Sequence, residues 1–163
     1  MGGGGHDEGG GGGGGGEAEA PGAPRARIDV LLPVRDGMAF LEASLRSLQA
    51  QSFADIRVLV IDDGSRDGSA ALVERLAASD PRLVLRRRPA QGLVPALNFA
   101  LAQATAPYVA RHDADDLAYP QRLARQLAFL EAHPDHAAVG ARFDRIDAGG
   151  RPIAEGRWPP DPA

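Results

Sequence analysis

The architecture follows from a short apolar segment, Ile28-Asp29-Val30-Leu31-Leu32-Pro33-Val34. Its length and its branched side chains predict a buried β-strand. A polar turn at residues 35–37 ends the strand, and apolar side chains at helical spacing follow it. These side chains predict one inward face of a helix over residues 38–51, and they are Phe40, Leu41, Leu45 and Leu48.

The same alternation of strand and helix continues along the chain. Further strands are predicted at residues 56–61, 83–85 and 108–110, and further helices at residues 69–78, 94–104 and 119–132. A strand at residues 138–146, a turn at 148–151 and a return strand through Ile153 predict an antiparallel addition. We therefore predict an α/β fold with a Rossmann-like, mostly parallel sheet and helices on both faces.

The two ends of the chain are predicted to lie outside this domain. Residues 1–24 are almost entirely glycine and small residues, which bury little and lose much backbone entropy on folding, so they predict a disordered tail. The folded domain is expected to span residues 25–158. Residues 159–163 form a short predicted tail.

Composition excludes several kinds of chemistry. The chain has no cysteine, which rules out thiolate metal sites and disulfides, and all 18 basic residues are arginine, which rules out lysine Schiff bases. A net charge of −4 argues against a nucleic-acid partner. No apolar run is long enough for a transmembrane segment and no signal peptide is visible, so we predict a cytoplasmic protein.

Polar groups follow three of the predicted strands. They are Pro33 to Asp36, Asp62 to Ser65, and Asp113 to Asp116, and the ends of parallel strands converge on one rim where ligands bind. Crowded carboxylates repel one another unless a cation bridges them, and Mg²⁺ takes one or two carboxylates together with substrate phosphates. At the level of each motif alone, helix capping at Asp113 to Asp116 and turn formation at Asp62 to Ser65 remain open.

Four sequence blocks together resemble the family 2 glycosyltransferases of the GT-A type. The blocks are IDVLLPVRD (28–36), VIDDGSRDGS (60–69), QGLVPALN (91–98) and YVARHDADD (108–116). The resemblance implies a GT-A fold, with the main chain of Pro33 and Val34 lining the base pocket. It also implies that Asp63 contacts the base, that the Gly92 loop lies near the diphosphate, and that Asp115 is the foremost metal ligand.

The resemblance supplies the full set of predicted site residues. The metal ligands are Asp115 and Asp113, for Mn²⁺ or Mg²⁺, and Asp113 alternatively faces the ribose. The predicted nucleotide-binding residues are Pro33, Val34, Arg35, Asp36, Asp62, Asp63, Gly92, Asn98, Asp113 and Ala114. Arg35 stands where the family often has an aromatic residue, and a guanidinium can also stack on a base. Leu97 stands where many members have an arginine, so the resemblance does not carry over one diphosphate contact at this position.

The implied reaction transfers a sugar, usually with inversion, from a nucleoside diphosphate sugar to a glycan or lipid-linked acceptor. We favour a UDP-sugar donor and a role in cell-envelope polysaccharide assembly, in the cytoplasm or at the inner face of the membrane. Inversion requires a general base. The family's base lies well beyond the metal motif, so the acceptor region is expected to be incomplete here and the base to lie beyond Ala163.

Three other interpretations compete with a glycosyltransferase. A non-catalytic nucleotide-binding remnant would share the donor site but lack the base. An EF-hand-like calcium loop would use Asp63, Ser65, Asp67, Gly68 and Glu74, although a strand rather than a helix is predicted before it. A phosphatase of the haloacid dehalogenase type would also use Asp-x-Asp at a strand end, but it normally needs a lysine, and this chain has none. The histidines His112, His133 and His136 are interpreted as packing or surface residues.

Overall fold

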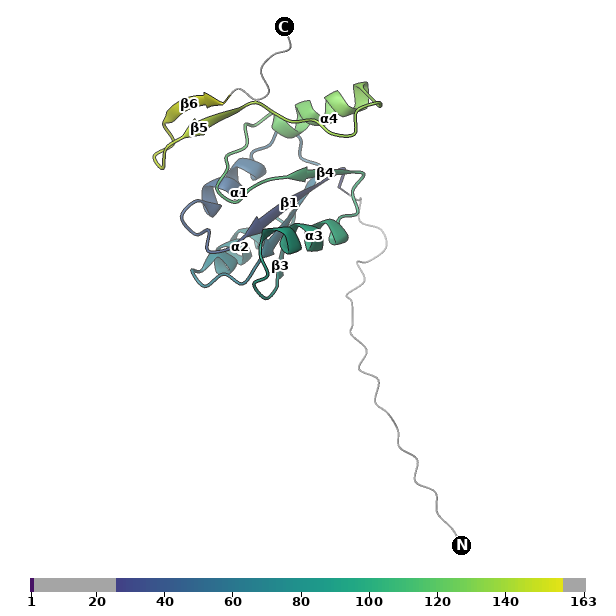
Figure 1. Cartoon of the computed structure of the whole chain (residues 1–163), viewed down its shortest axis with the longest axis vertical. Helices are drawn as coiled ribbons and strands as arrows, with labels where there is room; N and C mark the ends of the chain where they lie inside the picture. Colours follow the sequence, from purple (N-terminus) through teal and green to yellow (C-terminus); the bar gives the residue numbers. More distant parts are fainter. Residues whose placement is uncertain (2–25, 157–163) are drawn as a thin grey trace.

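The computed structural model describes residue 1 and residues 26–156, and the predicted tails at 1–24 and 159–163 otherwise lie outside the described residues. Four parallel strands form the main sheet in the order β3-β2-β1-β4 (Figure 1). The predicted α/β class is confirmed. The strands are β1 (Ile28–Val34), β2 (Ile56–Asp62), β3 (Leu83–Arg87) and β4 (Tyr108–Arg111). The helices are α1 (Leu41–Gln49), α2 (Ser69–Ala77), α3 (Leu93–Gln103) and α4 (Arg122–Ala132).

The central strand β1 is buried along its whole length, as its continuous apolar sequence predicts. It pairs with β2 from Ile28 opposite Ile56 to Val34 opposite Asp62, and with β4 on its other side. The strands therefore end at the same edge of the sheet, and the loops after β1, β2 and β4 meet there.

Helices cover both faces of the sheet. The larger core joins β1 and β2 to α1, α2 and α4, whereas α3 packs through Ala96 and Ala100 onto the opposite face. One expectation about α1 was wrong, because Phe40 is 46% exposed and precedes the helix. Its N–H donates to the carbonyl of Gly37, which makes it part of the loop after β1 rather than of the core.

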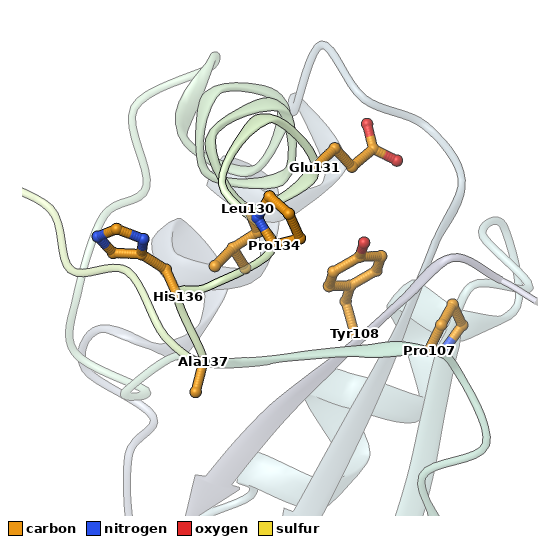
Figure 2. Close-up of a pocket in the computed structure, with 7 residues that line it drawn as sticks. All are labelled: Pro107, Tyr108, Leu130, Glu131, Pro134, His136 and Ala137. Atoms are coloured by element: carbon orange, nitrogen blue, oxygen red, sulfur yellow. The ribbon is translucent and has the colours of Figure 1, made fainter.

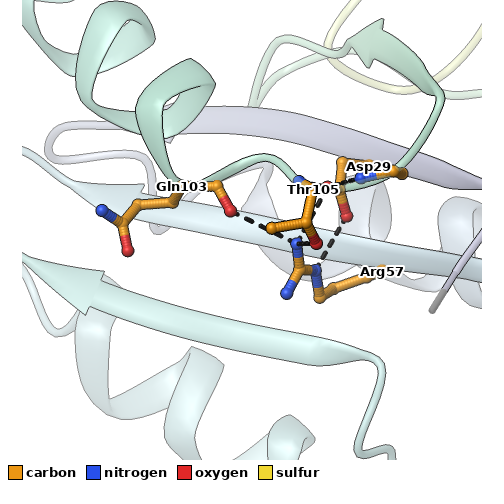
Figure 3. Close-up of polar contacts among 5 residues, drawn as sticks. Asp29, Arg57, Gln103 and Thr105 are labelled. Atoms are coloured by element: carbon orange, nitrogen blue, oxygen red, sulfur yellow. Dashed lines mark hydrogen bonds and ion pairs between the residues drawn. The ribbon is translucent and has the colours of Figure 1, made fainter. Parts of the chain in front are cut away.

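A buried ion pair fixes the loop before β4 (Figure 3). The Asp29 carboxylate in β1 accepts two hydrogen bonds from Arg57 at 2.8 Å each, and further ones from the N–H groups of Thr105 and Ala106 at 2.7 and 2.9 Å. Burial alone would raise the pKa of Asp29, but these donors outweigh it and hold the pKa below its usual value. The α3–β4 loop is thereby attached to the middle of the sheet.

The last two strands form a separate hairpin. Strands β5 (Phe143–Ile146) and β6 (Pro152–Gly156) pair antiparallel with each other, and not with the main sheet as the predicted addition suggested. The hairpin lies beside α4 (Figure 1). The Tyr119 hydroxyl, just before α4, donates to Asp144 at 2.5 Å. Within the described part of the chain, no helix has the length and apolar character needed to cross a membrane.

Candidate functional site

A pocket of about 350 Å³ opens at the carboxyl ends of β1 and β4. It brings together seven of the predicted site residues, which are Pro33, Val34, Arg35, Asp36, Asp113, Ala114 and Asp115. Gly37, Phe40, Leu93 and Arg111 complete its lining. The loops after β1 and β4 therefore line one cavity, as predicted. The loop after β2 is not part of the lining, and it contacts the loop after β1 through hydrogen bonds to Asp36.

The acidic loop that follows β4 forms one wall of this pocket. The N–H of Asp116 donates to the carbonyl of Asp113 at 3.1 Å, which closes a tight turn. The Asp113 carboxylate accepts two hydrogen bonds from Arg111, at 3.0 and 2.9 Å. Partial burial, together with the charges of Asp113 and Asp115, raises the pKa of the Asp116 carboxyl. The acidic loop therefore places two carboxylates, Asp113 and Asp115, in the pocket lining, with Arg111 paired to the first.

The oxygen donors at this wall suit a hard divalent cation whose coordination sphere is completed by oxygen atoms of the substrate. Asp113 and Asp115 both line the pocket, and oxygen atoms are what Mg²⁺ and Mn²⁺ prefer. Across the described residues no group of three or more histidines and carboxylates is arranged as a complete metal site. The two carboxylates leave positions for phosphate oxygens and water, as expected where the substrate itself supplies ligands.

Asp63 has main-chain partners in the loop before α3. Its carboxylate is buried and accepts from the N–H groups of Gln91 and Gly92, the latter at 2.7 Å, while Arg88 lies 3.5 Å away. Asp63 therefore holds the loop that leads into α3. A direct contact between Asp63 and a base stays a prediction.

The remaining predicted residues are not part of the pocket lining. Asp62 is buried and accepts the N–H of Ser65 at 3.0 Å, so it shapes the turn after β2. Gly92 adjoins the lining residue Leu93, and Asn98 is exposed on α3. Their contact with a nucleotide is a prediction that rests on the resemblance.

The calcium-loop alternative is wrong in structural terms. Strand β2 precedes the segment, and α2 begins at Ser69, so Glu74 lies within the helix and pairs with Arg87 at 2.8 Å. The carboxylate of Asp67 instead accepts the N–H groups of Ser69 and Met38, at 3.0 and 2.8 Å. The segment after β2 braces the loop after β1.

That bracing extends along the whole β1 loop. Asp36 has a left-handed backbone conformation with φ of 50°, and its N–H donates to Ser65 Oγ at 3.0 Å. Its carboxylate in turn accepts the N–H of Arg66 at 2.7 Å. The N–H of Gly37 donates to Ser69 Oγ at 3.1 Å. These hydrogen bonds hold the lining residues Asp36 and Gly37 in place.

The sequence did not single out four lining residues, which are Gly37, Phe40, Leu93 and Arg111. Gly37 was interpreted only as part of the turn after the first strand. Phe40 fitted the apolar spacing of the helix, and Leu93 and Arg111 lay inside recognised blocks without an assigned role. His112 is buried against Ser44, which agrees with the packing role predicted for it. Its pKa is lowered to about 4, chiefly by burial and also by Arg122.

A second pocket, of about 550 Å³, lies at the opposite end of β4 (Figure 2). Tyr108, Glu131 and His136 border it, beside Pro107 and the end of α4. It is larger than the pocket at the acidic loop. We nevertheless place the candidate site at the acidic loop, because ligands of open parallel sheets bind at the carboxyl ends of the strands.

Comparison with known proteins identifies the family. Residues 29–159 match the family model described as "Glycosyl transferase family 2". The putative glycosyltransferase EpsE of Bacillus subtilis is 34% identical over 70% of this chain, and the amylovoran biosynthesis glycosyltransferase AmsE of Erwinia amylovora is 35% identical over 68%. Each alignment covers 42% of the relative, so the chain spans about two fifths of these curated relatives.

Solved structures show the same fold. The S. aureus protein TarS, in complex with UDP, matches with a TM-score of 0.62 and 27% identity, over 66% of this chain and 33% of TarS. A mannosyltransferase from Pyrobaculum calidifontis, in complex with GDP-Man and Mn²⁺, matches with a TM-score of 0.63 and 30% identity, over 75% of this chain and 36% of that protein. With the GT-A architecture, the four sequence blocks and the family match in agreement, this chain belongs to glycosyl transferase family 2.

Proposed function

We propose that this chain forms the donor-binding part of a metal-dependent glycosyltransferase that transfers a sugar, with inversion, from a nucleoside diphosphate sugar. The observation that carries the proposal is the pocket between the β1 loop and the acidic loop. One wall offers main chain and Arg35 to a base, and the other offers carboxylates to a cation and a diphosphate.

The nucleotide in this proposal is UDP. TarS matches this chain in structures with UDP and with UDP-GlcNAc, whereas the mannosyltransferase was solved with GDP-Man, so GDP is the first competitor to test. The base lies against Pro33, Val34 and Arg35. Asp63 contributes by holding the Gly92 loop in place, and the proposed base contact adds to that role.

Asp115 and Asp113 hold Mn²⁺ or Mg²⁺ in this proposal. When bound, the cation offsets negative charge on the departing diphosphate as a Lewis acid. The acceptor is a glycan or a lipid-linked glycan of the cell envelope. The proposed location is the cytoplasm, at the inner face of the membrane.

Calorimetry of the chain with UDP, GDP and dTDP, each with and without Mn²⁺, tests the proposal. We expect UDP to bind best, with an affinity that rises at least about ten-fold with Mn²⁺. Asp115→Asn should remove most of this metal effect, because the substitution deletes a charged ligand. Asp135→Asn is the matched control, since Asp135 is exposed and far from the pocket.

Two outcomes would contradict the assignment. If none of the nucleotides binds, the assignment of a donor site is wrong. If the effect of Mn²⁺ on affinity persists in Asp115→Asn, the assignment of Asp115 as a metal ligand is wrong. The remnant hypothesis makes the same binding prediction. A turnover assay with a glycan acceptor separates the two hypotheses, because a remnant binds the donor but transfers no sugar.

A further inference from the structure

His112 is the buried polar side chain nearest the acidic loop, and the proposed function gives it no role. It follows β4 directly, is 4% exposed, and its main-chain N–H donates to the Leu31 carbonyl at 3.0 Å. Its ring nitrogens face two different elements. Nε2 lies 3.0 Å from Ser44 Oγ in α1, and Nδ1 lies 3.5 Å from Nη2 of Arg122 in α4.

The Ser44 hydroxyl indicates how His112 takes part. It has a single hydrogen, and the Asp113 carbonyl beside it can only accept, so the ring nitrogen that faces Ser44 is the donor in that pair. His112 then carries a hydrogen on Nε2, and the main-chain carbonyl of Asp116 also lies within hydrogen-bonding reach of the ring. The Ser44 hydroxyl then donates its own hydrogen to the main-chain carbonyl of Asp113, 3.3 Å away.

This series of hydrogen bonds ends on the atom that closes the acidic turn. The Asp113 carbonyl accepts from Ser44 Oγ and also from the N–H of Asp116. Three carboxylates within four residues repel one another, so the turn needs an attachment to the rigid part of the fold. Helix α1 provides it, because Ser44 is 1% exposed and cannot move without disturbing the core.

We propose that His112 is a positioning residue, which acts through Ser44 Oγ to hold the Asp113 carbonyl and so to aim the carboxylates of Asp113 and Asp115 into the pocket. The proposal rests on the proposed function, because it is that function which gives the two carboxylates a cation and a diphosphate to bind. His112 itself touches neither ligand.

Calorimetry with UDP and Mn²⁺ on single and double variants provides the first test. Ser44→Ala and His112→Leu should each weaken Mn²⁺-dependent UDP binding by roughly two- to ten-fold, the range for one lost hydrogen bond. UDP binding without metal should not change. His112→Gln should recover most of the loss, since its amide can donate to Ser44.

The double variant Ser44→Ala/His112→Leu shows whether the two residues act on Mn²⁺-dependent UDP affinity through the same hydrogen bonds or independently. If His112 acts through Ser44, the double variant binds no more weakly than the worse single variant. Losses that multiply, or equal losses without metal, would overturn the proposal. Leu76→Val is the control, because it weakens the core in α2 away from the pocket and should leave the metal effect intact.

NMR of the ligand-free chain tests the proposal independently of nucleotide binding. The ¹⁵N signals of the His112 ring should show a neutral ring with its hydrogen on Nε2, and a hydrogen on Nδ1 would overturn the proposal. Ser44→Ala should shift the amide signals of residues 113–116 more than Leu76→Val does. If wild type binds no nucleotide, the proposed function fails, and these amide signals still decide the positioning role: unchanged signals refute it.

Discussion

The guanidinium of Arg111 holds both carboxylate oxygens of Asp113, with Nε 3.0 Å from Oδ1 and Nη2 2.9 Å from Oδ2. Both side chains line the pocket, and their exposed fractions are 57% for Arg111 and 40% for Asp113. A cation that binds Asp113 must therefore compete with a cation that the chain already supplies. Exposed pairs of this kind contribute only about 0.2–1 kcal/mol, so a divalent metal can displace the arginine.

Removing Arg111 should therefore strengthen metal binding to the nucleotide-free chain. We expect Arg111→Ala to raise the Mn²⁺ affinity about two- to five-fold, measured by titration of free Mn²⁺ with electron paramagnetic resonance. Arg75→Ala makes the same change in net charge on the exposed side of α2 and should have a smaller effect. An unchanged or weaker affinity in Arg111→Ala would show that the two cations do not compete.

Two glycines in left-handed conformations should differ in their tolerance of alanine. At Gly64, with φ of 78°, a Cβ atom would lie 2.9 Å from the main-chain nitrogen of Ala90, whereas at Gly68, with φ of 93°, it would meet nothing within 4 Å. Gly68→Ala should cost about 1 kcal/mol of unfolding free energy from backbone conformation alone. Gly64→Ala should cost more in urea unfolding, since the backbone of the Gly92 loop must also move. Equal costs would contradict this close approach.

The buried pair between Asp29 and Arg57 should matter far more than an exposed pair. Arg57→Met leaves the Asp29 carboxylate buried without its counter-ion, and we expect a loss of about 3 kcal/mol in unfolding free energy. Arg46→Met is the matched control, because Arg46 forms an exposed pair with Glu42 within α1 and should cost under about 0.5 kcal/mol. Similar losses in the two variants would mean that the ion pair does not hold the α3–β4 loop.

The strands and helices of the main sheet could be predicted from sequence because hydrophobic periodicity reports burial directly. Every predicted strand and helix from residue 28 to residue 132 is present, with ends shifted by a few residues. The prediction that Phe40 faces the core was wrong, because an apolar residue at the start of a helix fits the helical spacing whether it faces the core or a pocket. The hairpin was placed wrongly, because alternation predicts a strand but not its partner.

The candidate site could be predicted only in part, because a motif places residues on a rim but says nothing of their hydrogen bonds. The convergence of the β1 loop and the acidic loop followed from topology. The hydrogen bond from the Gly92 N–H to Asp63 joins groups 29 residues apart. The pairing of Arg111 with Asp113 is local, but a motif does not say which way the two side chains turn. His112 shows the same limit, since only the structure brings it to Ser44.

The Asp80 carboxylate should make stability depend on pH in the acid range. Hydrogen bonds from Arg82, and also from Gln49, lower the pKa of Asp80 to about 2 although partial burial opposes them. The stabilisation is therefore complete above the unfolded-state pKa of about 3.9 and is lost as the pH falls towards 2. In urea unfolding, Asp80→Asn should cost about 1 kcal/mol at pH 7 and progressively less below pH 4. A cost for Asp80→Asn that is constant from pH 7 to pH 3 would contradict the assignment.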